Sequence, residues 1–182
     1  MRKSIGLLEF KSIAKGIQAA DEMVKSANVE IILATPMCPG KYIVILAGDV
    51  GDVTNAVGVG KEVGLSYLIS EYTIASVHEK VFPAITATCD FDNISSIGVI
   101  ETMSAVASVI VGDTVLKAAN VELLEIRIAR GLGGKGYVIL TGEVSAVKAA
   151  IEAAEAKLED GGDIIGTVVL PSPSKELVQT LL

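Results

Sequence analysis

The sequence predicts an α+β protein made of two tandem copies of one small domain. Two observations carry this prediction: motifs recur in the same order in both halves, and each half alternates β-rich runs with amphipathic helical segments. Residues 4–9 (SIGLLE) recur 92 positions later as residues 96–101 (SIGVIE). The length of 182 residues is sufficient for two domains of about 90 residues each.

Further matches follow in the same order. Residues 25–30 (KSANVE) recur as 117–122 (KAANVE), again 92 positions later. Gly40-Lys41 recurs as Gly134-Lys135 at a spacing of 94. The second copy therefore has two extra residues before Gly134. Chance similarity between apolar segments would not preserve this order, so we infer a tandem duplication. We expect one domain over residues 1–88 and a second over 94–182, with the connector in residues 86–95.

The first copy is expected to start with a strand over residues 5–10 and a helix that Ser12 caps and that continues to Ala27. Apolar residues recur along that helix at spacings of three and four, which predicts one buried face. The residues expected on this face are Ile13, Ile17, Ala20 and Val24.

The remaining elements complete the same pattern twice. We expect a loop over residues 35–41 between two strands, and a helix capped by Asp49 or Asp52. The order strand, helix, strand, strand, helix, strand, with split βαβ connections, predicts a ferredoxin-like layer in each copy. The ranges expected are 29–34, 42–47, 67–75 and 164–170 for strands and 145–158 for a helix.

Composition excludes some classes of function. With 15 basic and 22 acidic residues the net charge is −7, which argues against a nucleic-acid partner. Hydrophobic residues make up 51% of the chain, but the longest apolar run, residues 105–111, is too short to span a membrane. We therefore expect a cytoplasmic protein whose apolar excess lies between subunits, and Cys38 and Cys89 need an explanation other than a disulfide framework.

Each half resembles a bacterial microcompartment shell domain. The motifs that carry the resemblance are Ile-Gly-x-x-Glu at the start, Lys-x-Ala-Asn-Val-Glu after the first helix, Gly-Lys at the start of a strand, and Gly-Asp/Glu-Val before the second helix. Tandem members of this family form homotrimers that mimic hexamers, and these pseudohexamers tile into a polyhedral shell with other shell proteins. The resemblance thus implies a structural, non-enzymatic function in the microcompartment shell.

Residues 37–41 (MCPGK) resemble the T-type shell proteins of propanediol-utilisation microcompartments. That resemblance implies one 4Fe-4S cluster per trimer at the central pore, ligated by Cys38 from three chains. Such a cluster takes four ligands, so one iron is left for water or an outside ligand. Pro39 and Gly40 favour a tight turn, which projects the Cys38 side chain away from the sheet. The implied role is electron transfer or cluster delivery across the shell, with a redox enzyme of the lumen as a further partner.

The second copy offers no equivalent ligand, because Leu132 stands opposite Cys38 in the repeat alignment. Its glycine-rich loop lacks the spacing of a phosphate-binding loop, and crowding near a symmetry axis explains the glycines equally well. The residues predicted to form the pore loops beside Cys38 are Met37, Pro39, Gly40, Lys41, Arg130, Gly131, Leu132, Gly133 and Gly134.

Lys25 and Lys117 occupy the family position that lines the edge between neighbouring assemblies. The alternative is an ordinary solvated lysine at a helix C-terminus, where a cation suits the helix dipole. The family's Pro-Arg-Pro-His segment reads Ser76-Val77-His78 in the first copy and Pro171-Ser172-Pro173 in the second, without its arginine.

Two other functions stay open at the level of the sequence. The trimer could conduct small metabolites through a pore that Cys38 lines without a cluster, or the chain could be a ferredoxin-like regulatory module that binds a ligand. A catalytic site is not expected, since no nucleophile and base form a recognisable arrangement.

Overall fold

The computed structural model describes residues 4–90, 94–128, 131–158 and 163–181. The chain separates into two compact units. The first extends to Glu79 and also includes loop residues 131–134; the second contains the described residues from Lys80 to Ile128 and from Lys135 onwards. Among the described residues, no helix is long and apolar enough to cross a membrane.

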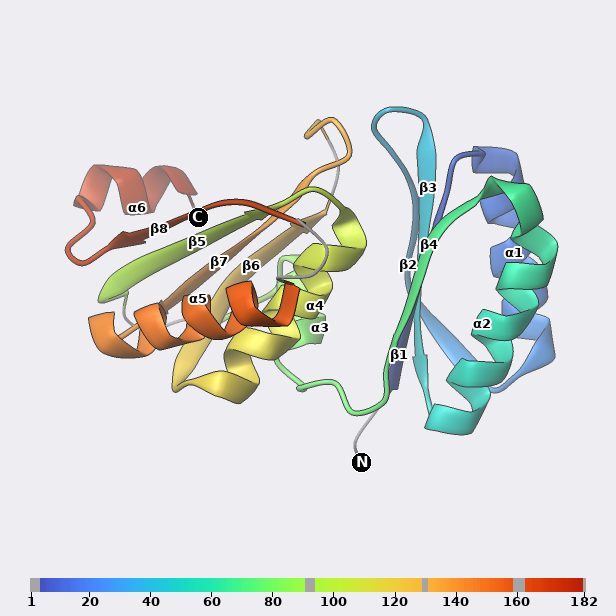
Figure 1. The fold of residues 1–182 in the computed structure, drawn as a ribbon, viewed down its shortest axis with the longest axis horizontal. Coiled ribbons are helices and arrows are strands. Elements are labelled where there is room, and N and C mark those ends of the chain that lie inside the picture. Colours follow the sequence, from blue (N-terminus) through green and yellow to red (C-terminus); the bar gives the residue numbers. More distant parts are fainter. Residues whose placement is uncertain (1–3, 91–93, 129–130, 159–162, 182) are drawn as a thin grey trace. The chain divides into compact units, whose positions relative to one another are not determined.

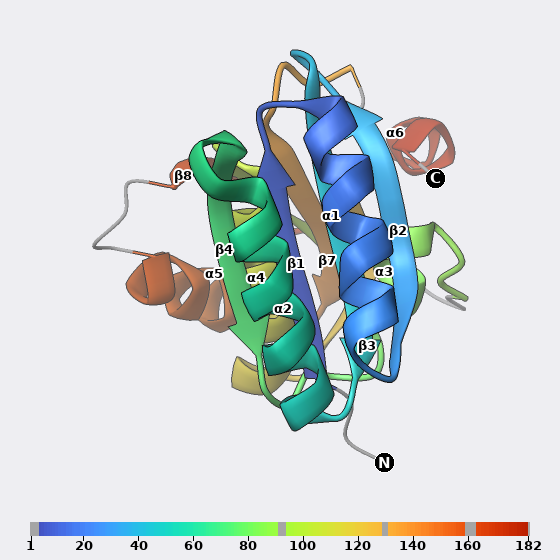
Figure 2. The ribbon, with the colours of Figure 1, turned by 90° about the vertical axis from the view of Figure 1, so that its right-hand side faces the viewer.

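The first unit is a four-stranded antiparallel sheet with two helices on one face (Figure 2). The strand order is β2-β3-β1-β4, the order of a ferredoxin-like layer, as predicted. Its elements are β1 (Ser4–Phe10), α1 (Ile13–Ser26), β2 (Val29–Met37), β3 (Lys41–Gly48), α2 (Val50–Gly64), a 3-10 turn (Leu65–Tyr67) and β4 (Leu68–Ile74).

The second unit repeats this topology with the order β6-β7-β5-β8. Figure 1 shows α4 and α5 on one side of its sheet and α6 on the other. Its elements are α3 (Val81–Thr86), β5 (Ser96–Thr102), α4 (Ala105–Ala118), β6 (Val121–Ile128), β7 (Gly136–Gly142), α5 (Val144–Leu158), β8 (Ile164–Leu170) and α6 (Lys175–Leu181).

Strands β2 and β3 are longer than predicted, and the expected loop over residues 35–41 was too long. Thr35, Pro36 and Met37 continue the pairing opposite Ile43, Tyr42 and Lys41, so only residues 38–40 turn. Pro36 has no backbone N–H to donate, and a proline in the sequence argues against a central strand. Strand β2, however, lies at the edge of the sheet, where proline is tolerated.

The predicted buried face of α1 was wrong for three of its four residues. Ser12 caps the helix as expected, accepting a hydrogen bond from the Lys15 amide at 3.3 Å, and Ala20 is buried. Ile13, Ile17 and Val24, however, are 38%, 53% and 39% exposed.

Smaller residues face the sheet instead. The buried positions of α1 are Gly16, Ala19, Ala20 and Met23. A Cβ atom on Gly16 would lie 2.6 Å from the Cβ of Tyr42, so this glycine permits a close approach of α1 to β3. The β-branched residues Ile13, Ile17 and Val24 are consequently turned outward, while Met23 is buried.

Candidate functional site

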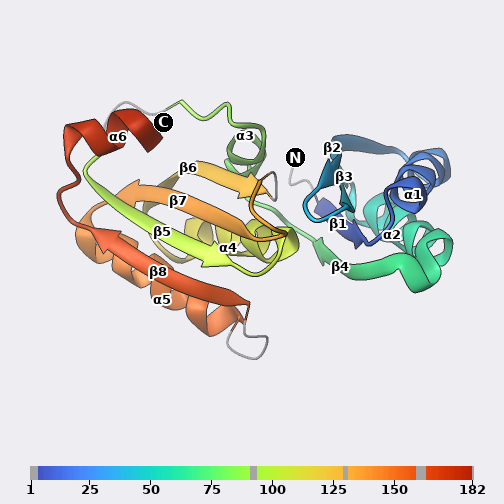
Figure 3. The ribbon, with the colours of Figure 1, turned by 90° about the horizontal axis from the view of Figure 1, so that it is seen from above.

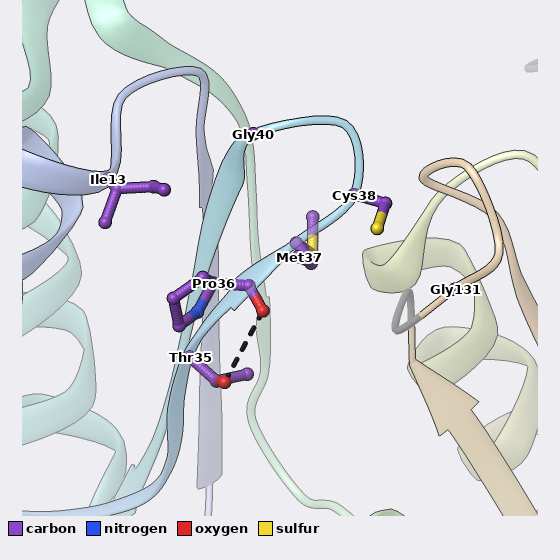
Figure 4. Close-up of a pocket in the computed structure, with 7 residues that line it drawn as sticks. All are labelled: Ile13, Thr35, Pro36, Met37, Cys38, Gly40 and Gly131. Carbon is purple, nitrogen blue, oxygen red and sulfur yellow. Dashed lines mark hydrogen bonds between the residues drawn. The ribbon is translucent and has the colours of Figure 1, made fainter.

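The predicted pore loop of the first repeat is the tip of the β2–β3 hairpin. Cys38, Pro39 and Gly40 connect the two strands, and Gly40 adopts φ +79°, a left-handed conformation that favours glycine. Cys38 is exposed, as predicted, while the preceding Met37 is 4% exposed and fixes the end of β2. Figure 4 shows the Cys38 sulfur at the hairpin tip, directed away from Ile13.

A cavity of about 410 Å³ lies beside this hairpin. The lining side chains that the structure describes are uncharged. The lining residues are Ile13, Thr35, Pro36, Met37, Cys38, Gly40 and Gly131 (Figure 4).

The second-repeat loop lies next to the Cys38 turn. Gly131, Gly133 and Gly134 all have positive φ, at 75°, 64° and 95°, and a Cβ atom on Gly134 would lie 3.4 Å from the Cys38 carbonyl oxygen. Leu132 is half-buried. Arg130, which we also predicted in this loop, lies outside the described residues.

An ion pair holds the strand end behind Cys38. Lys41 Nζ donates to Glu9 Oε1 at 2.6 Å, and the Glu9 side chain is fully buried in the central strand β1. In the described part of the chain, Glu9 Oε2 has no hydrogen-bond partner. The second repeat has the same pair, Lys135 with Glu101 at 2.9 Å, but there both side chains are more than 40% exposed.

Sequence reasoning missed this ion pair. We interpreted the recurrence of Glu9 and Glu101 only as a consequence of the repeated fold. The signal was available, since each repeat has a glutamate and a lysine 32 or 34 positions later, at Lys41 and Lys135.

Both predicted edge lysines lie in the last turns of equivalent helices. Lys25 pairs with Asp21, and this hydrogen bond raises the pKa of the lysine. Lys117 Nζ lies 2.5 Å from Asp113 Oδ2. Both lysines thus pair with an aspartate one turn earlier, although Asp21 is exposed and Asp113 nearly buried. The position of both lysines at an assembly edge stays a prediction.

The second cysteine differs from the first. Cys89 is half-buried, and burial, followed by the nearby Asp90 carboxylate, raises the pKa of its thiol. Raising the pKa keeps the thiol protonated, and the thiolate is the form that binds metal. Across the described residues of one chain, no three His, Cys, Asp or Glu side chains come close enough to hold a metal ion together.

Two ferredoxin-like units of the same strand order in tandem, the first with a tight turn between β2 and β3, define the class of tandem microcompartment shell proteins. The family model of the BMC domain matches this chain twice, over residues 4–77 and 96–173, and the chain belongs to that family.

Individual relatives agree with this assignment. The chain is 36% identical over 177 residues to the bacterial microcompartment shell protein PduT of Citrobacter freundii, covering 97% of this chain and 96% of the relative. It is 29% identical over 192 residues to the carboxysome assembly protein CcmO of Synechococcus elongatus, covering 98% of this chain and 68% of that protein. The crystal structure of a microcompartment protein from Desulfitobacterium hafniense superposes with a TM-score of 0.93 at 40% identity, over 98% of this chain and 99% of that one.

Proposed function

We propose that this shell subunit works as a homotrimer that carries one 4Fe-4S cluster at its centre, ligated by Cys38 from each of three chains. The single observation that carries the proposal is the exposed thiol at the tip of the β2–β3 hairpin. The trimer would tile with other shell proteins and would transfer electrons, or deliver the cluster, across the shell to a redox enzyme inside.

The unequal burial of equivalent helices supports an assembly of several copies. Ile13 and Ile17 of α1 are exposed, whereas their counterparts in α4, Ala105 and Val109, are 0% exposed. In a closed ring of alternating repeats, every such helix would have a similar environment. A neighbouring chain that covers α1 would therefore remove its exposed apolar surface from water.

The residues of this chain fit a cluster ligated by three chains together, and they do not fit a cluster ligated by one chain alone. One exposed thiol per chain supplies one ligand, and a cube of this type takes four, usually thiolates. Three chains around an axis would supply three equivalent thiolates. When bound, the cluster would supply one-electron redox chemistry.

The chain's own residues would fix the position of the ligand. The turn at Pro39 and Gly40 presents Cys38 beyond the sheet, and the ion pair of Lys41 with buried Glu9 fixes the start of β3 behind it. Met37, buried on the other side of Cys38, holds the end of β2. Cys38 is thereby attached to two paired strands and not to a long loop.

The test is anaerobic purification with measurement of iron, sulfide, the visible spectrum and the mass in solution. We expect about four irons per three chains in a fully loaded protein. Cys38→Ser should remove iron and the absorbance near 400 nm while the trimer persists, and the matched variant Cys89→Ser should keep both. If Cys89→Ser loses iron and Cys38→Ser does not, Cys89 and not Cys38 is the ligand.

A trimer of the unmodified protein without iron or sulfide would contradict the cluster. That result would favour the second function, a pore for small metabolites that Cys38 lines.

A further inference from the structure

The first sheet contains two buried oxygen atoms that lack a hydrogen-bond partner among the described residues. They are Glu9 Oε2 in β1 and Ser70 Oγ in β4. Glu9 is 0% exposed, and its other carboxylate oxygen, Oε1, accepts from Lys41. A buried polar atom without a partner costs free energy, so such atoms in native proteins nearly always bind another polar group or ordered water. The two atoms therefore indicate a small polar binding site within the first repeat.

The two side chains face each other across neighbouring strands. Strand β1 lies between β3 and β4 in the first sheet, as Figure 3 shows. Glu9 is the direct partner of Ser70 in the antiparallel pair of β1 with β4. Directly opposed residues point to the same side of a sheet, with Cβ atoms about 4.5–5.5 Å apart. The carboxylate and the hydroxyl thus lie on one face, close enough for a single small molecule to bridge them.

The second repeat has the same glutamate and lysine but lacks the serine. The counterpart of Ser70 is Gly166, which pairs with Glu101. The Glu101 side chain is 42% exposed, and a Cβ atom on Gly166 would meet nothing within 4 Å. Solvent can therefore hydrate this carboxylate directly. Of the two repeats, only the one with the buried glutamate has a hydroxyl at this position.

Charge and hydrogen-bonding capacity define the molecule that fits the site. The Glu9 carboxylate already contacts the Lys41 ammonium, so the pair has no net charge. A second cation at this position would be repelled by the lysine, and an anion would be repelled by the carboxylate. The carboxylate oxygen only accepts hydrogen bonds, whereas a hydroxyl both donates and accepts. The site therefore suits a neutral molecule that can donate and accept, and water is the smallest such molecule.

We propose that Glu9 Oε2 and Ser70 Oγ together bind one buried water molecule. The water donates to the carboxylate and accepts from the hydroxyl, which gives it two polar partners in the protein. It thereby connects β4 to the ion pair between β1 and β3, and Lys41 of that pair is three residues after Cys38. The site links three neighbouring strands and positions the hairpin that presents Cys38. It is formed by one repeat and does not depend on the proposed homotrimer or cluster.

A high-resolution crystal structure of the unmodified protein tests the site directly. We expect an ordered water molecule within about 3.2 Å of both Glu9 Oε2 and Ser70 Oγ. A direct hydrogen bond from Ser70 to Glu9, with no water between them, would overturn the proposal.

Two variants of matched shape test the contribution of the hydroxyl. Ser70→Thr keeps it, whereas Ser70→Val replaces it by a methyl group of similar size. The valine variant should have an unfolding equilibrium constant about tenfold higher than the threonine variant in urea titrations, because the water loses one of its partners. Ser66→Ala, at an exposed serine of the same repeat, should leave this constant unchanged. Equal stability of the threonine and valine variants would contradict the site, and if neither folds, the water in the unmodified protein decides.

Hydrogen exchange separates a positioning function from a general loss of stability. In Ser70→Val the backbone amides of residues 41–43 should exchange several-fold faster than in Ser70→Thr, because the start of β3 is held less firmly. The corresponding amides of the second repeat, in residues 135–137, should change less. Equal acceleration in both repeats would show that the hydroxyl supports the fold as a whole and does not position the Cys38 hairpin.

Discussion

Lys41 and Glu9 show how one residue pair can differ between two copies of a fold. Glu9 is fully buried and accepts from Lys41, whose side chain is 26% exposed, while the equivalent Glu101 and Lys135 are 42% and 46% exposed. A buried carboxylate depends on its partner much more than a solvated one does, because water can replace the partner only at the surface.

Lys41→Met should therefore destabilise the fold strongly. Removal of the lysine leaves the Glu9 carboxylate buried without a cation, at a cost of about 3–5 kcal/mol in the free energy of unfolding. The matched variant Lys135→Met should cost less than about 1 kcal/mol. Urea unfolding of both variants measures the difference, and equal losses would show that Glu9 is as well hydrated as Glu101.

The exposure of Cys38 could be predicted from the residues next to it, since Pro39 and Gly40 favour a turn. The repeated spacing of glutamate and lysine could have indicated the ion pair, but not its unequal burial, because both repeats have the same residue types at similar spacing. Burial of Glu9 depends on residues far away in the sequence, and only the folded chain distinguishes it from Glu101.

At the scale of elements, the Ser12 cap of α1 could be predicted from the sequence because capping is local, whereas Asp49, expected to cap α2, stands at the N-cap position without a side-chain hydrogen bond. Ser12 accepts from the Lys15 amide, and Ser104 accepts from the Ala107 amide at 3.1 Å. Which face of α1 points outward could not be predicted in this way. Spacing shows which residues share a face, but the close approach of Gly16 to Tyr42 decides which face meets the sheet.

Ser104→Ala should cost about 1 kcal/mol in the free energy of unfolding, since the first turn of α4 loses the acceptor for a buried amide. Thr114→Ala removes a hydroxyl from the same helix that only donates back to the Ile110 carbonyl, at 2.8 Å. That control should change stability by no more than about 0.5 kcal/mol. Thermal unfolding of both variants tests the assignment, and a cap variant as stable as the control would refute it.

At the scale of the whole molecule, the repeats have the same strand order and register but unequal surroundings. The duplication, the α+β class and the strand order follow from periodicity and repeated motifs, which are properties of the sequence. The distribution of exposed apolar residues does not, because Ile13 and Ile31 lie uncovered where Ala105 and Leu123 are buried. We interpret this inequality as the part of the fold that neighbouring chains complete.

The lateral edges of the proposed trimer give the last prediction. Lys25 and Lys117 lie in the last turns of equivalent helices, each paired with an aspartate one turn earlier, at Asp21 and Asp113. If both lysines reach a neighbouring assembly, the double variant Lys25→Gln and Lys117→Gln should keep the trimer mass and impair sheet formation. The exposed ion pair of Lys25 with Asp21 contributes only about 0.3–0.5 kcal/mol. The Asp113 side chain is only 9% exposed, so loss of Lys117 costs more than that, and circular dichroism checks that the double variant folds.

The control for the edge prediction removes the same number of positive charges at two lysines that are not predicted to lie at the edge. Lys15, which donates to Gln18 at 2.9 Å, and Lys157, in the last turn of α5, are exposed or partly exposed lysines of this kind. The double variant Lys15→Gln and Lys157→Gln should form sheets at the protein concentration that the unmodified protein requires, as seen by electron microscopy. If it impairs tiling as much as the Lys25 and Lys117 variant does, net charge and not position controls assembly. Unchanged tiling by the Lys25 and Lys117 variant would identify these residues as solvated helix ends, because a lysine at a tight contact between assemblies cannot lose its charge without weakening that contact.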